Sequence, residues 1–181
     1  MKSTIGLMAA FLLFYIYVYV NAQAAGNNEA PEAAKCADRK KAVLLLRALN
    51  PSAGDHFYTT NATEMDIATR TLGYVAEGNA GFIFKDHIER SVPLYRLHNL
   101  TTIDHFYTAS AKERDSVGGY VYEGIAGYVY PEQLCGSVAL LRGWSAQGTD
   151  HFYTTSDVEM ENAILHVGYV SEGTTGYVLP G

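Results

Sequence analysis

The residues of this chain that could do chemistry recur three times in the same order. An Asp-His-Phe-Tyr-Thr block occupies 55–59, 104–108 and 150–154. An arginine stands eight residues before each block, and Gly-Tyr and then Glu-Gly follow it. Arginine and glutamate bind polar ligands through charge-assisted hydrogen bonds, and aromatic rings stack on sugars. Up to three equivalent ligand-binding sites could therefore form, with the candidate residues Arg47, Arg96, Arg142, Glu77, Glu123, Glu172, Tyr74, Tyr120 and Tyr169.

The same residues also have a structural interpretation. Each arginine lies in an apolar segment, where a charge needs a partner, and the glutamate of the same copy is the natural one. The tyrosines would then pack in the core with their hydroxyls hydrogen-bonded. Trp144 stands where the other copies have Leu49 and His98, so it is either a core side chain or a copy-specific aromatic at a site.

We expect the Asp-His pairs to be structural. Neighbouring strand residues point to opposite faces, so one pair would not chelate one ion. Three histidines on a threefold axis could hold zinc, but recurrence in every copy favours a role in the fold. Each histidine would bond a backbone carbonyl and each aspartate the amides of the preceding turn. We expect no metal and no cofactor; the residues of this structural motif are Asp55, His56, Asp104, His105, Asp150 and His151.

Patterns typical of enzymes are missing from the sequence. The segment 143–148 is not a nucleophile elbow, because its second glycine is one place too late. There is no HExxH motif and no phosphate-binding glycine loop. Paired carboxylates could still meet in space without a sequence trace. We expect no enzyme activity and no catalytic residue.

Each copy is predicted to be strand–strand–helix–strand. The apolar segments 42–49, 92–97 and 138–144 are the first strands, and the Asp-His-Phe-Tyr-Thr blocks are the second. Helices begin at the N-caps Asn61, Ser110 and Ser156, each followed three residues later by glutamate, and end at a glycine (73, 119 or 168). The last strands are the Gly-aromatic runs 81–84, 127–130 and 176–179.

Units this small cannot exclude enough water to be stable alone. We therefore predict a mainly β (α+β) fold with one short helix per repeat, in which three strand–strand–helix–strand repeats form a pseudo-threefold closed assembly. One globular domain would span 36–181 and contain repeat 1 (42–86), repeat 2 (87–134) and repeat 3 (135–181).

The N-terminus resembles a secretory signal. A lysine at position 2 precedes an apolar run at 5–20, and cleavage is expected after Ala22, which leaves a polar segment at 23–41. The alternative, a membrane anchor, needs about 20 apolar residues. We expect a secreted protein with no membrane insertion after cleavage.

Secretion changes how cysteines and asparagines are interpreted. Cys36 and Cys135 are expected to form one disulfide rather than a free or metal-bound pair. Asn61 and Asn99 begin N-glycosylation sequons. The formal net charge of −6 argues against nucleic acid as a partner, because that would need clustered lysine and arginine. The oligomeric state does not follow from the sequence.

The pattern DHFYT, GY, EG and GYV resembles a tandem-repeat family of unknown function found in secreted proteins, alone or appended to hydrolases. The resemblance covers about residues 42–181. It implies an extracellular module, with carbohydrate as one class of target, and supplies no catalytic residues.

Repetition suits multivalent binding by weak, equivalent sites. We therefore expect a secreted, non-catalytic binding module whose partners are extracellular glycans or matrix components, with a lectin-like activity favoured. The alternative is a structural protein of an extracellular or mineralised matrix, and an orphan hydrolase or defence protein is a third class.

Overall fold

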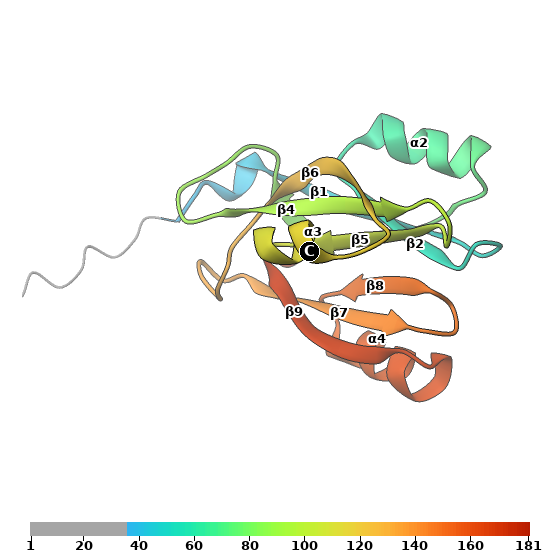
Figure 1. Ribbon diagram of the computed structural model, residues 1–181. Coiled ribbons are helices and arrows are strands. Elements are labelled where there is room, and N and C mark those ends of the chain that lie inside the picture. The colour runs from blue at the N-terminus through green and yellow to red at the C-terminus, as the bar shows by residue number, and fades with distance from the viewer. Residues whose placement is uncertain (1–35) are drawn as a thin grey trace, which may run out of the picture. The chain divides into compact units, whose positions relative to one another are not determined.

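A computed structural model describes residues 36–181, which form one compact unit (Figure 1). The predicted signal peptide (1–22) and most of the polar segment 23–41 lie outside the described residues. Among residues 36–181, no helix has the length and apolar character needed to cross a bilayer.

The strands and helices follow the predicted order in all three segments. A 3-10 turn, η1 (Arg39–Lys41), precedes them. The first segment contains β1 (Ala42–Asn50), β2 (Asp55–Thr59), α2 (Ala62–Thr71) and β3 (Val75–Phe84). The second contains β4 (Val92–Asn99), β5 (Asp104–Thr108), α3 (Ala111–Ser116) and β6 (Val121–Val129). The third contains β7 (Val138–Ser145), β8 (Asp150–Thr154), α4 (Asp157–Asn162), the π-helical turn η2 (Ala163–Val167) and β9 (Val170–Val178).

The fold is mainly β, as predicted, with short helices beside two sheets (Figure 1). The six-stranded sheet has the order β2-β1-β3-β6-β4-β5, and the three-stranded sheet has the order β8-β7-β9. Within each segment, the first strand pairs antiparallel with both the second and the last strand. The Asp-His-Phe-Tyr-Thr strands are therefore held on one side by the first strand of their own segment.

The three last strands begin earlier than predicted, and each contains a β-bulge at the Glu-Gly pair. Arg47 pairs with Gly78 while Ala48 pairs with Ala76, so Glu77 is the extra residue between them. Gly78 has φ +90°, a left-handed conformation that a side chain would disfavour. The same shift occurs beside Arg96 and Arg142. A bulge re-aims the side chain of the extra residue, and here it directs a glutamate to the arginine of the neighbouring strand.

The predicted helix starts are confirmed. Asn61, Ser110 and Ser156 are the N-caps, and their side chains accept backbone N–H groups of the first turn. The helices end less uniformly than predicted. Gly168 is the C-cap of η2 with φ +90°, whereas α2 ends at Thr71, before Gly73.

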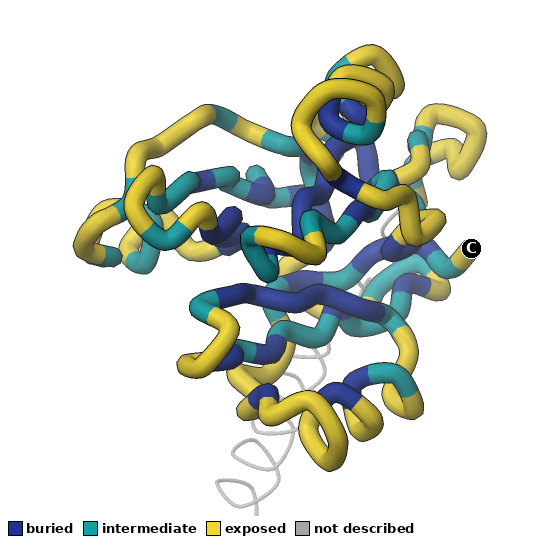
Figure 2. Tube along the Cα trace, turned by 90° about the vertical axis from the view of Figure 1, so that its right-hand side faces the viewer, coloured by how far each residue is buried: buried dark blue, intermediate teal, exposed yellow. Residues whose placement is uncertain are grey.

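The core lies between the segments, where the Asp-His-Phe-Tyr-Thr strands meet. Every residue of β2, β5 and β8 is buried, which a strand with one solvent-exposed face would not be. Figure 2 shows the buried stretches inside the unit and the exposed stretches on its helices and loops. Apolar side chains from the first and last strands of every segment complete this core: Leu45, Leu94, Leu140, Ile83, Val129 and Val178.

Short contacts join the last strands of the three segments to one another. Phe84 pairs with Tyr128, Tyr130 forms a bridge with Tyr177, and Phe82 forms a bridge with Leu179. Each pair of segments is thus linked once through the ends of β3, β6 and β9.

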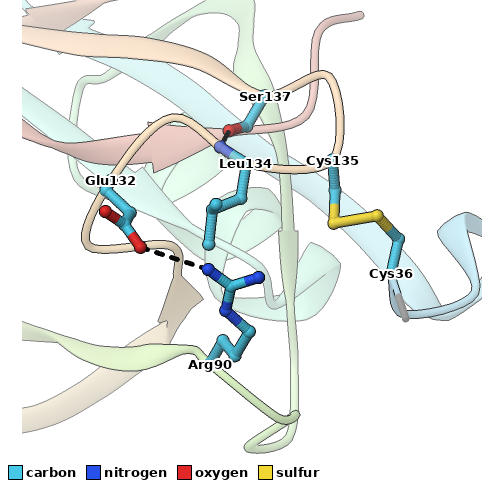
Figure 3. The surroundings of a disulfide bond; sticks show 6 residues. All are labelled: Cys36, Arg90, Glu132, Leu134, Cys135 and Ser137. Atoms are coloured by element: carbon cyan, nitrogen blue, oxygen red, sulfur yellow. Dashed lines mark hydrogen bonds and ion pairs between the residues drawn. A yellow bond between two sulfur atoms is a disulfide. The ribbon is translucent and has the colours of Figure 1, made fainter. Parts of the chain in front are cut away.

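The predicted disulfide is present between Cys36 and Cys135, with Cα atoms 5.6 Å apart (Figure 3). It joins the start of the described chain to the connection between β6 and β7. The backbone N–H of Leu134 donates to Ser137 Oγ at 3.0 Å, and Arg90 pairs with Glu132 at 3.2 Å in the same region.

Candidate functional site

Three buried tyrosines lie at the centre of the unit. The hydroxyl of Tyr107 accepts the backbone N–H of Tyr58 at 2.8 Å and donates to the Tyr58 carbonyl at 2.6 Å. Tyr153 bonds Tyr107 in the same way, and Tyr58 bonds Tyr153. Burial raises the pKa of all three hydroxyls well above its usual value, so they remain donors. β2, β5 and β8 are edge strands, each with one partner in its sheet. The cycle of tyrosine hydrogen bonds links these three strands to one another.

Each aspartate of the repeated block bonds the histidine of another segment. Asp55 Oδ1 accepts the His105 backbone N–H at 2.7 Å, and Asp55 Oδ2 lies 2.7 Å from His105 Nδ1. The Tyr74 hydroxyl donates to the same carboxylate. The equivalent groups are Asp104 with His151 and Tyr120, and Asp150 with His56 and Tyr169.

The expected local partners of these residues were wrong in detail. The sequence predicts that each aspartate bonds its own turn and each histidine a carbonyl, but each aspartate instead bonds a histidine of another segment and a tyrosine of its own. Burial alone would raise the pKa of Asp55, yet the hydrogen bonds from His105 and Tyr74 outweigh it and lower that pKa.

Each arginine lies between two glutamates. Arg47 Nε faces Glu77 of the bulge at 3.1 Å, an ion pair without hydrogen-bond alignment. Its two terminal nitrogens donate to Glu159 on α4 at 3.0 and 2.8 Å. Arg96 lies in the same way between Glu123 and Glu64, and Arg142 between Glu172 and Glu113. The predicted pairs with the bulge glutamates are present, whereas the helix glutamates were not among the candidates.

The helix glutamates were assigned only to capping. Each follows an N-cap by three residues, and its side chain also accepts the threonine hydroxyl that ends the repeated block. Burial by itself raises the pKa of Glu64, Glu113 and Glu159, but the arginine and threonine hydrogen bonds outweigh it and lower the pKa of each. A glutamate fixed near a helix start was the only sequence signal for this second role.

We name the three places where a helix glutamate meets an arginine by their elements. They are the α2–β4 junction (Glu64 with Arg96), the α3–β7 junction (Glu113 with Arg142) and the α4–β1 junction (Glu159 with Arg47).

The α4–β1 junction contains a cavity of about 640 Å³. Its wall carries Arg47, His56, Glu77, Glu159 and Tyr169, together with apolar groups such as Phe152 and Leu49. His56 Nε2 lies 3.5 Å from Glu77, while its other ring nitrogen is held by Asp150. The cavity therefore combines cationic, anionic and apolar surface within one small volume.

The α2–β4 junction contains a second cavity, of about 400 Å³. Arg96, His105, Glu123, Glu64 and Tyr74 occupy the same places in this wall. At the α3–β7 junction the corresponding charged pairs are formed as well, and the Trp144 ring lies 4.4 Å from the His151 ring. The residue paired with the histidine thus differs at each junction: Leu49, His98 or Trp144.

The structure groups the candidate residues across segments rather than within them. Arg47 and Glu77 share their cavity with Tyr169, and Arg96 and Glu123 share theirs with Tyr74. Sequence alone could not show this, because it depends on which segments pack together. The tyrosine hydroxyls are occupied by aspartates, as the structural interpretation requires, and their rings line the cavities.

The two sequon asparagines lie at the ends of elements. Asn61 is exposed at the start of α2, and Asn99 is half-buried at the end of β4. Their side-chain oxygens accept backbone N–H groups of the following turn.

Within residues 36–181, three ligand atoms of acidic residues or histidines come within 4.8 Å of one another in two clusters. One consists of Asp55, Asp104 and Asp150, whose carboxylates already accept the hydrogen bonds described above. The other consists of His98, His105 and Glu123. The three histidines of the repeated blocks, weighed above as a zinc site, form neither cluster.

Comparison with known proteins gives a family but no function. No curated protein and no solved structure matches the chain. A family model described as a domain of unknown function, DUF5648, matches residues 44–179, which include β2 to β9 and all but the first two residues of β1. The chain belongs to the DUF5648 family.

Proposed function

We propose that this protein is a secreted, non-catalytic binding module that takes carbohydrate into the cavities between its segments. The observation that carries the proposal is the α4–β1 cavity, which presents arginine, glutamate and histidine beside apolar and aromatic wall atoms. A sugar has hydroxyls that need donors and acceptors and C–H faces that pack on apolar surface. The walls of this cavity offer both within about 640 Å³.

The proposal includes a repeat assembly. We infer that the segments 42–86, 87–134 and 135–181 are three repeats around a pseudo-threefold axis. Three kinds of contact each occur three times and link different segments, which supports this arrangement: those between the tyrosines, those between aspartate and histidine, and those between arginine and helix glutamate. Binding sites at the junctions would then be related, and weak sites would combine into avidity on a repetitive glycan.

A catalytic role is less well supported than binding. The Asp150–His56 pair beside Glu77 has the ingredients of an acid–base group. The same pair recurs at every junction, however, and each aspartate also accepts a backbone N–H and a tyrosine hydroxyl. Because these hydrogen bonds of the aspartates and histidines recur in every segment, a role in the fold explains them better than catalysis does.

A glycan array with the full chain tests the proposal. Leu49→Trp fills the α4–β1 cavity with the side chain that the α3–β7 junction has at the paired position. We expect the wild type to bind a defined class of glycan, with binding competed by free sugar and weakened by Leu49→Trp. Leu100→Trp makes the same change at a side chain that is 64% exposed in a turn, and it should bind as the wild type does.

Two outcomes would contradict the proposal. A double variant with Leu49→Trp and His98→Trp changes both cavities. Glycan binding that is unchanged in this variant would show that the glycan binds elsewhere on the protein. No bound glycan, with recovery of the protein only from insoluble matrix, would favour the structural alternative.

A further inference from the structure

The second cavity holds one side chain, His98, that neither the scaffold nor sugar binding requires. His98 is paired with His105 across β4 and β5, and their rings are stacked 4.1 Å apart at an angle of 5°. The equivalent positions hold Leu49 and Trp144 at the other junctions, so the paired histidines occur at the α2–β4 junction alone among the described segments. Scaffold residues recur at all three junctions, and His98 does not.

The nitrogens of His98 are not used by the fold. Its Nε2 is buried and has no hydrogen-bond partner among the described residues, and its Nδ1 lies 3.7 Å from Glu123 Oε1, beyond hydrogen-bond distance. A buried polar atom without a partner costs free energy, so its presence in one segment calls for an explanation. Burial first, and then the neighbouring His105, lowers the pKa of His98.

His105 is oriented as a metal-binding histidine usually is. Its Nδ1 is held by Asp55 at 2.7 Å, which leaves Nε2 facing Glu123 at 3.8 Å. A carboxylate that fixes the far nitrogen of a ligating imidazole sets its tautomer and raises its basicity. Each of His98, His105 and Glu123 offers one ligand atom, and these atoms lie within 4.8 Å of one another.

We propose that His98, His105 and Glu123 bind a divalent transition-metal cation of the zinc type, with its remaining coordination positions open to the 400 Å³ cavity. Two imidazoles and a carboxylate are a donor set that suits zinc and its neighbours and leaves room for water or a ligand oxygen. The site does not depend on the glycan proposal, since it needs only these side chains.

Ion binding requires a local movement. Parallel rings direct their lone pairs in parallel planes, so one ring must turn before both can reach one ion. His98 is the ring that can turn, because its side chain is 17% exposed and unbonded, whereas Asp55 holds His105. Arg96 Nε lies 2.8 Å from Glu123 Oε2, the oxygen that His105 Nε2 also faces, and its charge opposes a nearby cation, which keeps the affinity below that of a three-histidine site.

Calorimetric titration of the untagged full chain with Zn²⁺, without sugar, tests the site. We expect about one equivalent to bind at neutral pH, and His98→Leu to weaken binding by about tenfold or more. Leucine stands at the equivalent position of the first segment, so the fold tolerates it there. Glu123→Gln should also weaken binding.

Two further variants make the test specific. His87→Leu removes an exposed histidine outside the cavities and should bind as the wild type does. Leu49→His places a second histidine beside His56 and Glu77 and should add a second equivalent. Absence of binding by the wild type, or equal binding by wild type and His98→Leu with matching circular dichroism, would overturn the proposal.

Discussion

The inner strands of this molecule keep one sequence, whereas the three positions paired with their histidines, here called the cavity floors, vary. The strands β2, β5 and β8 have one sequence repeated three times, and all their residues are buried. On the first strands, the positions paired with the histidines of these blocks carry Leu49, His98 or Trp144, and Leu49 and His98 line the two cavities. The tyrosines of these strands bond one another, and each aspartate bonds a histidine of another segment, so a change in one strand disturbs the others. Leu49 and His98 line cavities, and such a residue can differ without this cost.

The largest expected effect comes from breaking the inner network at one aspartate. Asp55→Ala leaves the buried His105 N–H and the Tyr74 hydroxyl without an acceptor. We expect the free energy of unfolding to fall by about 3–5 kcal/mol, measured by chemical denaturation. Asp66→Ala removes an exposed ion pair on α2 and should cost less than about 1 kcal/mol. Equal losses in the two variants would refute the proposed difference between inner and outer residues.

A smaller effect is expected from one hydroxyl of the tyrosine cycle. Tyr58→Phe removes the acceptor of the Tyr153 N–H and the donor to the Tyr153 carbonyl. The cost should be about 1–3 kcal/mol in the same denaturation assay. Tyr107→Phe and Tyr153→Phe should cost similar amounts, because their contacts are equivalent. Tyr122→Phe, at a side chain that is 48% exposed, is the control and should be nearly neutral.

Acid should weaken the links between the segments. The pKa values of Glu64, Glu113 and Glu159 are lowered from an ordinary 4.5, so below pH 4.5 the unfolded chain binds more protons than the folded one. The stability from these groups is full above that pH and is lost as the pH falls through the lower folded values. Glu64→Gln should flatten the dependence of unfolding free energy on pH. Identical slopes in wild type and variant would exclude this origin.

The smallest effect is expected at the cavity floors. Leu49→Trp and His98→Leu exchange residues that the segments already use at this position. Each should change the free energy of unfolding by less than about 1 kcal/mol, because the cavity accommodates the change. A loss as large as that of Asp55→Ala would show that the floors are part of the scaffold.

Local features of the fold could be predicted from the sequence. Apolar runs and N-cap residues gave the first strands within two residues and the helix starts without error, because these depend on near neighbours. The disulfide followed from the number of cysteines and the expected compartment. The bulge could have been found too, since a glycine inside a strand pattern often marks one.

Contacts between segments could not be predicted. Glu159 meets Arg47 across 112 residues, and no local pattern indicates which helix packs on which strand. For the same reason the aspartates were assigned to their own turns, and His98 was treated only as a counterpart of Trp144. The histidine cluster needs the β4–β5 register and the bulge at Glu123 together, and neither follows from composition.

The Cys36–Cys135 disulfide determines which fragments a protease can release from this molecule. The two cysteines are 99 positions apart and the chain between them contains the first two segments, so one cut in any loop there leaves both pieces covalently joined. A cut after residue 135, for example in the β7–β8 turn, frees a C-terminal fragment that only non-covalent contacts retain. A single nick in the first two segments therefore releases no fragment while the bond is intact, whereas a nick in the third segment can.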